Sequence, residues 1–212
     1  MVAKPPRPGK IVCVGRNYAA HARELGHEVP AEPLLFFKPP SAIIPAGGEI
    51  VVPAGVGRVD FEGEVAFVVG TRARSVPREE GWGVLSHLAA ANDVTARDLQ
   101  RTDGQWTRAK GFDTFLPLGE PVALEGVDRD ALELRTLVNG ELRQLGRIGE
   151  MIFDPPTLVS FISGIMTLEP GDLILTGTPE GVGPLAPGDE VQVRIEGAPP
   201  LRNRVVAGAR DG

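Results

Sequence analysis

The strongest strand signal in this chain reads Val59-Asp60-Phe61-Glu62-Gly63-Glu64-Val65-Ala66-Phe67-Val68-Val69. Successive side chains of a strand point to opposite faces, so the acidic residues at 60, 62 and 64 share one face. From Val65 onward both faces are apolar, which predicts a strand that is buried on both sides. Gly63 leaves the face opposite the glutamates bare, so another segment can approach closely there.

Neighbouring carboxylates on this face would lie roughly 7 Å apart. Burying them unpaired is unfavourable, so arginines, protonation or a bound cation must neutralise them. A second acidic element, Asp93, ends the apolar run at residues 84–91 and Asn92, just before a helix start. Carboxylate oxygens suit Mg²⁺, Mn²⁺ or Ca²⁺ better than zinc. The alternatives are an amphipathic strand with a solvated acidic face, and a turn or capping role for Asp93.

A short helix is predicted from about Tyr18 to Leu25, capped by Asn17 and ended by Gly26. His21 and Glu24 are three residues apart and can touch on one face of it. A carboxylate beside an imidazole raises its basicity and fixes its tautomer, as a general base requires. The alternative is an ordinary surface pair on a solvated helix.

Other segments complete a chain in which strands predominate. Strands are predicted at residues 11–14, 34–38, 49–52, 173–176, 190–196 and 201–206, and a hairpin at residues 134–144 turning at Val138-Asn139-Gly140-Glu141. Helices are predicted at residues 96–101, with Thr95 and Asp98 as a capping box, and at residues 155–165. Without a linker or an internal repeat, the simplest organisation is one domain over residues 1–212, with a loose arm at residues 1–10.

Composition narrows the class of protein. The 212 residues carry a net charge of -6, which argues against a nucleic-acid partner. The chain has a single cysteine, Cys13, within an apolar run, so a buried structural thiol and a cytoplasmic location are favoured. No apolar run is long enough to predict a membrane span, and the first ten residues lack the apolar stretch of a signal peptide.

Several motifs, in this order and spacing, resemble the fumarylacetoacetate hydrolase family, especially its short single-domain acylpyruvate hydrolases and 2-hydroxyhepta-2,4-diene-1,7-dioate isomerases. The resemblance runs from Val12 to about Val193. The motifs are Val14-Gly15-Arg16-Asn17-Tyr18, Glu62-Gly63-Glu64, Asn92-Asp93-Val94-Thr95-Ala96-Arg97-Asp98, Trp106-Thr107-Arg108-Ala109-Lys110-Gly111-Phe112-Asp113, Val138-Asn139-Gly140-Glu141 and Thr176-Gly177-Thr178-Pro179-Glu180-Gly181-Val182-Gly183.

The resemblance implies a fold, a cofactor and a site. The fold would be mixed, β-rich α+β, a β-roll like the C-terminal domain of fumarylacetoacetate hydrolase, and the protein would be a homodimer. The metal, Mg²⁺ or Mn²⁺, would be held by Glu62, Glu64 and Asp93. The catalytic residues would be His21, Glu24 and Lys110, with residues 16–27 as a lid, and the substrate contacts would be Arg16, Asn17, Gln100 and Thr178.

The function that follows is cleavage of a carbon–carbon bond in acylpyruvate-type 2-oxo acids through a metal-stabilised enolate. His21 with Glu24 would activate the attacking water, and Lys110 would add positive charge at the developing oxyanion. The same enolate would serve a 2-hydroxy-dienoate isomerase of aromatic catabolism or an oxaloacetate decarboxylase. A non-catalytic dimeric binding protein of the same fold, with its acids neutralised by arginines, is the alternative from another class. The role of Asp60 stays open.

Overall fold

The computed structural model describes residues 8–24, 28–129 and 131–209. The strands are β1 (Ile11–Gly15), β2 (Leu34–Lys38), β3 (Ile43–Ile44), β4 (Glu49–Val52), β5 (Val59–Phe61), β6 (Gly63–Val69), β7 (Leu85–Asn92), β8 (Thr95–Ala96), β9 (Leu116–Pro117), β10 (Val122–Ala123), β11 (Glu133–Val138), β12 (Glu141–Arg147), β13 (Leu173–Leu175), β14 (Gly183–Pro184), β15 (Glu190–Ile195) and β16 (Leu201–Ala207). The α-helices are α1 (Ala19–Glu24), α2 (Gly81–Val84), α3 (Arg97–Thr102), α4 (Thr107–Lys110) and α5 (Pro155–Ile165). Short 3-10 helices are η1 (Pro40–Ala42), η2 (Arg78–Glu80) and η3 (Ile148–Glu150).

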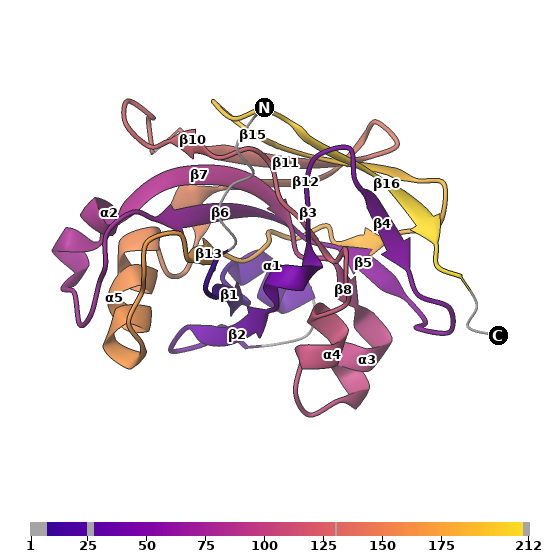
Figure 1. Cartoon of the computed structure of the whole chain (residues 1–212), viewed down its shortest axis with the longest axis horizontal. Helices are drawn as coiled ribbons and strands as arrows, with labels where there is room; N and C mark the ends of the chain where they lie inside the picture. Colours follow the sequence, from indigo (N-terminus) through magenta and orange to yellow (C-terminus); the bar gives the residue numbers. More distant parts are fainter. Residues whose placement is uncertain (1–7, 25–27, 130, 210–212) are drawn as a thin grey trace.

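Two larger sheets dominate the architecture. One has six strands in the order β10-β7-β6-β13-β1-β2, and the other has five in the order β12-β11-β15-β16-β4. Smaller sheets are formed by β14-β5-β8 and by β3-β9. Figure 1 shows α2 and α5 at the left end of the molecule and α3 with α4 on its lower side, to the right of centre. This arrangement of mixed sheets with few helices agrees with the β-rich α+β class predicted from the sequence.

The prediction of one continuous strand at residues 59–69 is wrong at Glu62, where the strand is interrupted. Residues before Glu62 form β5 of the three-stranded sheet, and residues after it form β6 of the six-stranded sheet. Glu62 leaves both ladders because its N–H donates to the side-chain oxygen of Asn92, at 2.9 Å, and its carbonyl accepts from the N–H of Asp93, at 2.8 Å. The acidic segment therefore joins two sheets and brings Glu62 beside Asp93.

Burial of β6 on both faces is confirmed. Val65 and Phe67 pack in the main core with Leu158 of α5 and Val193 of β15. On the opposite face, Ala66 joins a smaller cluster with β1, β9 and β13. Because apolar side chains are removed from water on both sides, β6 is a rigid central support for the carboxylates that precede it.

A close approach occurs at Gly63, as the sequence predicted. An added Cβ there would lie 2.0 Å from the hydroxyl oxygen of Thr136 on β11 and 3.2 Å from a side-chain oxygen of Gln144 on β12. The Gly63 N–H also donates to that Gln144 oxygen, at 3.0 Å. Only a residue without a side chain lets the two large sheets meet at this point.

The turn and helix predictions had mixed outcomes. The β11–β12 hairpin has positive φ at Asn139 (52°) and Gly140 (81°), as a type I′ turn requires. Helix α5 has the predicted bounds, and the Asp154 side chain accepts from the N–H of Thr157. The capping box at Thr95 and Asp98 is wrong, because α3 starts at Arg97 with no side-chain cap.

Asp98 accepts instead from the N–H of Arg58, at 2.9 Å, and the Thr95 hydroxyl donates to the carbonyl of Asp93, at 2.8 Å. Helix α1 begins at Ala19, and the predicted helix end at Leu25 and Gly26 lies outside the described residues. The Asn17 amide, predicted to cap this helix, hydrogen-bonds to Phe153 and to the carbonyl of Thr176. It therefore ties the start of the helix to distant parts of the chain.

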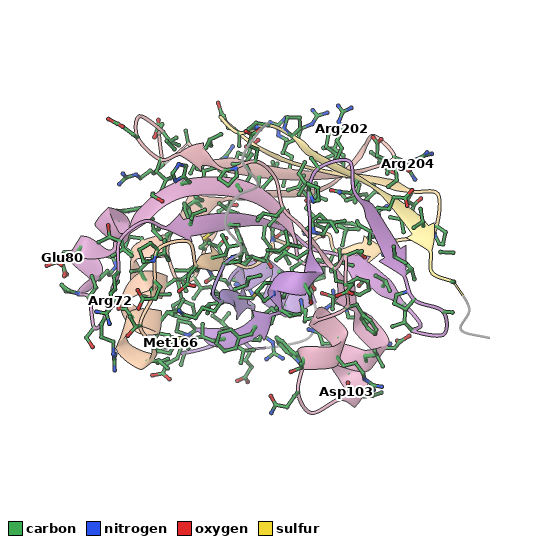
Figure 2. The ribbon with its side chains drawn as sticks, viewed as in Figure 1. Arg72, Glu80, Asp103, Met166, Arg202 and Arg204 are labelled. Atoms are coloured by element: carbon green, nitrogen blue, oxygen red, sulfur yellow. The ribbon has the colours of Figure 1, made fainter. Side chains whose placement is uncertain are left out.

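The single cysteine, the surface and the helices add three observations. Cys13 is buried and unpaired, as predicted. The outer side of the five-stranded sheet is charged, and Arg202 and Arg204 project from β16 into solvent (Figure 2). Within the described ranges, no helix combines the length and apolar character needed to cross a bilayer.

Replacing Gly63 by Ala should destabilise the fold by about 1–3 kcal/mol, because the new methyl group overlaps Thr136 in a packed interior. Urea unfolding should show the loss as a lower midpoint. Gly83→Ala is the matched control, since Gly83 lies in α2 with open space where its Cβ would be. An unchanged midpoint for the Gly63 variant would contradict the close approach.

Candidate active site

Three acidic side chains converge as the sequence predicted. Glu62 lies between β5 and β6, Glu64 lies on β6, and Asp93 directly follows β7. In the antiparallel β6–β7 pair Gly63 faces Asn92, which brings Asp93 next to Glu62. One oxygen of each carboxylate lies within 4.8 Å of the others, and all three residues are buried. Three hard oxygen donors this close together fit a divalent ion such as Mg²⁺ or Mn²⁺.

The pKa values of Glu62 and Glu64 shift in opposite directions. Although burial opposes ionisation, Lys110 and Arg97 hold the pKa of Glu62 well below its usual value. Glu64 accepts the N–H of Gly177 at 2.8 Å, but no cation contacts it among the described residues. Burial, together with the charges of Asp93 and Glu62, therefore raises its pKa well above the usual value. Glu64 is thus the carboxylate that most requires an added positive charge in order to ionise.

Lys110, at the end of α4, lies between two members of the triad. Its Nζ donates to Glu62 Oε2 at 2.8 Å and to Asp93 Oδ2 at 2.6 Å. Burial lowers the pKa of this ammonium, but the adjoining charges of Asp93 and Glu62 outweigh that effect and raise it. The predicted position of Lys110 beside the acidic cluster agrees with the structure, and its catalytic role stays a prediction.

Two further cations were missed by the sequence reasoning. Lys38, the last residue of β2, is buried and donates from Nζ to Asp93 Oδ1, at 2.6 Å, and to the carbonyl of Val94, at 3.1 Å. Burial is the main cause of its lowered pKa. The sequence showed that a lysine ends the apolar run Leu34–Lys38. It did not show which way the side chain of that lysine points.

Arg97 is the second cation that the sequence analysis missed, and its contacts explain the role of Asp60. Its guanidinium donates to Asp60 Oδ2 at 2.9 Å and to Glu62 Oε1 at 2.6 Å. Asp60 also accepts from Arg58, at 2.6 and 3.1 Å. Asp60 is therefore a buried ion-pair partner that positions Arg97, which in turn holds Glu62. The sequence signal was the place of Arg97 four residues after Asp93.

A cavity of about 340 Å³ opens over the acidic triad. Its lining includes the predicted site residues Arg16, His21, Glu62, Glu64, Asp93, Gln100, Lys110 and Thr178. Phe36 and Trp106 form an apolar wall, with their rings 5.2 Å apart in an edge-to-face arrangement. Asn17 and Glu24 are not part of the lining, and Asn17 is fully buried with its amide hydrogen-bonded elsewhere.

The predicted His21–Glu24 pair is formed. His21 Nδ1 lies 3.2 Å from Glu24 Oε2, and the imidazole is buried at the edge of the cavity. Glu24 also accepts the N–H of Gly181, at 3.1 and 3.2 Å, so α1 is held against the glycine-rich turn after β13. Lid motion of residues 16–27 stays a prediction, and residues 25–27, including His27, lie outside the described part.

The glycine-rich turn supports the site from the side of β6. The Thr178 hydroxyl donates to the carbonyl of Gly63 and accepts from the side-chain amide of Gln144, both at 2.8 Å. Gly177 has φ 92° and presents its N–H to Glu64. A Cβ at Gly177 would lie 2.9 Å from that of Asn17, so glycine is needed for both conformation and space.

The chain matches a known protein family over most of its length. Residues 10–206 match the family model described as fumarylacetoacetate (FAA) hydrolase, C-terminal. The chain belongs to the fumarylacetoacetate hydrolase family. The resemblance inferred from the motifs, including the fold of the family's C-terminal domain, is therefore confirmed.

Individual relatives in this family have different activities. The chain is 49% identical over 193 residues to a mitochondrial oxaloacetate tautomerase of Arabidopsis thaliana, covering 89% of this chain and 86% of the relative. A fumarylpyruvate hydrolase of Pseudomonas aeruginosa, solved with Mn²⁺ and pyruvate, superposes with a TM-score of 0.90 at 33% identity, covering 95% of this chain and 91% of the other. A 2-hydroxyhepta-2,4-diene-1,7-dioate isomerase of Mycobacterium marinum gives a TM-score of 0.87 at 46% identity, covering 96% and 77%. Hydrolases and isomerases thus share this fold.

Replacing Glu64 by Gln should abolish metal binding without unfolding the chain. The amide has the size of the carboxylic acid and keeps an oxygen to accept from Gly177, but it cannot supply a charged ligand. With Mn²⁺ at 100 times its Kd, the parent protein should gain about 2.7 kcal/mol of stability. Thermal melts with and without MnCl₂ should show this gain for the parent and none for the variant.

Glu80→Gln is the control for that measurement, because Glu80 is an exposed glutamate in η2. It should keep the full response to Mn²⁺. A normal response in the Glu64 variant would remove Glu64 from the metal site.

Proposed function

We propose that this protein is a divalent-metal-dependent enzyme that cleaves the carbon–carbon bond of acylpyruvate-type 2-oxo acids. The observation that carries the proposal is one cavity lined by three convergent carboxylates, a lysine ammonium and His21, whose imidazole is paired with Glu24 outside the lining. The fumarylpyruvate hydrolase solved with Mn²⁺ and pyruvate supports it. Mg²⁺ or Mn²⁺ is the proposed ion, because both are hard cations that prefer carboxylate oxygens.

Glu62, Glu64 and Asp93 would hold the ion. When bound, it would supply Lewis-acid stabilisation of the negative charge that develops on the 2-oxo group. Lys110 would add a second positive charge near that oxygen, and in a buried site such a charge is worth more than it is in water. Arg16 and Gln100, which line the cavity, would orient the carboxylate end of the substrate.

His21 is the proposed general base. Its Nε2 would take a proton from a water molecule while Glu24, near Nδ1, stabilises the imidazolium that results. The water oxygen would bond to the distal acyl carbon, and the bond from that carbon to carbon 3 of the pyruvyl unit would break. The electron pair of that bond would pass into the enolate of pyruvate. The proton on His21 would then go to carbon 3, which releases pyruvate and a carboxylic acid.

Replacing His21 by Ala should lower kcat/KM for acetylpyruvate by roughly 10²–10⁴-fold, the usual contribution of a positioned general base. Loss of acetylpyruvate absorbance in the presence of Mg²⁺ or Mn²⁺ measures the rate. His87→Ala is the control, because His87 is exposed on β7 and does not line the cavity. Equal rates for the two variants would remove His21 from the mechanism.

Tautomerisation of oxaloacetate is a second candidate, favoured by the relatives. The mitochondrial oxaloacetate tautomerases of Arabidopsis thaliana and Bos taurus are 49% and 44% identical to this chain, which exceeds the 33% of the fumarylpyruvate hydrolase. In this reaction a base takes the proton from the enol hydroxyl, and a proton is returned to carbon 3. The C=C electron pair forms the new C–H bond, and the C=O bond is restored. His21 would serve as the base in either transfer, and no water is consumed.

Direct comparison of the two reactions should separate these candidates. We expect Glu24→Gln to impair acetylpyruvate hydrolysis more than enol-oxaloacetate conversion, because water activation depends more strongly on a stabilised imidazolium. Absorbance of the enol and of acetylpyruvate follows both reactions on one preparation. If the parent protein converts enol-oxaloacetate with a far higher kcat/KM than acetylpyruvate, tautomerisation is the main function and the hydrolase proposal fails.

The remaining alternatives are weaker. The alternative of a non-catalytic binding protein predicted that the acids are neutralised by cationic side chains. Arg97 and two lysines do form ion pairs with Glu62 and Asp93. An open cavity lined by Arg97, Lys110 and the carboxylates argues for chemistry there instead. The homodimer and the cytoplasmic location stay predictions.

A further inference from the structure

Three cations cover the oxygens of two metal-site carboxylates. Arg97 contacts Glu62 Oε1 at 2.6 Å, and Lys38 contacts Asp93 Oδ1 at 2.6 Å. Lys110 contacts the remaining oxygen of each, Glu62 Oε2 and Asp93 Oδ2. Each of the four oxygens therefore accepts from one charged donor, and a divalent ion that uses them must share space with these cations.

Two of the three cations are anchored by partners outside the triad. Lys38 also donates to the carbonyl of Val94, at 3.1 Å. Arg97 also donates to Asp60, at 2.9 Å, and to the side-chain oxygen of Gln100, at 2.6 Å. These extra bonds fix both groups whatever occupies the metal site.

Lys110 has no such anchor. Within the described part of the chain, the hydrogen bonds of its Nζ go only to Glu62 and Asp93. Its ammonium faces the cavity and lies 4.9 Å from the centre of the Phe36 ring, which is also part of the cavity wall. A flexible four-carbon stem with three rotatable donors can turn from the carboxylates toward the cavity without disturbing the backbone.

We propose that Lys110 is a tethered cation that competes with the divalent ion for Glu62 and Asp93, and that metal binding displaces its ammonium toward the substrate. The inference rests on the proposed metal site and adds an order of events to it. Two positive charges on the same oxygens repel each other, so the movable one leaves. The lysine then faces the substrate anion only after the ion is in place, which makes substrate binding follow metal binding.

Mn²⁺ titrations of three proteins test the exchange: the parent, Lys110→Met and Lys38→Met. The electron paramagnetic resonance signal of free Mn²⁺ gives each Kd without any assay of activity. We expect Lys110→Met to bind Mn²⁺ at least about tenfold more tightly than the parent, because the competitor is gone. Lys38→Met is the matched control, since it removes the same charge from the same carboxylate at an anchored position. Its Kd should change much less.

The outcomes separate this inference from the proposed function. A parent protein that binds no Mn²⁺ would refute the metal-dependent function itself. If the parent binds Mn²⁺ but Lys110→Met binds it no more tightly, or if Lys38→Met tightens binding equally, the exchange is wrong and the metal site stands.

Chemical labelling of the parent protein provides a test that needs no variant of a buried lysine. A brief pulse of a small amine-acylating reagent, followed by mass spectrometry, measures the accessibility of each ammonium. Adding Mn²⁺ should increase acylation at Lys110 several-fold and leave Lys38 unchanged. No increase at Lys110 would overturn the exchange even if Lys38→Met fails to fold.

Discussion

The structure depends on compensating the negative charge of carboxylates that are buried side by side. Glu62 and Asp93 are 5% and 0% exposed, and neither could remain ionised in an interior without positive partners. Those partners come from three separate elements, with Lys38 ending β2, Arg97 starting α3 and Lys110 ending α4. Charge compensation therefore fixes where these elements sit around the site, and removing one partner would leave an uncompensated buried charge.

The break in the acidic strand is what brings these buried carboxylates together. A continuous strand would have placed its carboxylates in one row along a sheet face. By leaving the ladder at Glu62, the chain turns between two sheets and lets Asp93 approach from β7. Gly63 permits the second large sheet to close over this point, since any side chain would meet Thr136. The geometry of the candidate site and the packing of the sheets are thus set by the same three residues, Glu62, Gly63 and Glu64.

Much of the site was visible in the sequence because it depends on short-range spacing. Strand alternation predicted Glu62 and Glu64 close together, and helical periodicity predicted the contact of His21 with Glu24. Lys38 and Arg97 were not assigned roles, because long flexible side chains reach partners that spacing along the chain does not reveal. Lys38 bonds to a residue 55 positions away, and Arg97 to residues 37 and 35 positions away. The capping box at Thr95 failed for a different, local reason, since its hydroxyl donates to the carbonyl of Asp93 two residues earlier.

The amino-acid sequence by itself determined the elements whose signals are local: the doubly buried β6, the type I′ hairpin at Asn139-Gly140, helix α5, and which acids could meet. The tertiary structure alone decided which cations neutralise those acids, where the acidic segment changes sheet, and which carboxylate has no cationic contact among the described residues. The physical reason is the distance along the chain over which each kind of interaction acts. Backbone periodicity acts over a few residues, whereas burial and Coulomb interactions act between segments that only folding brings together.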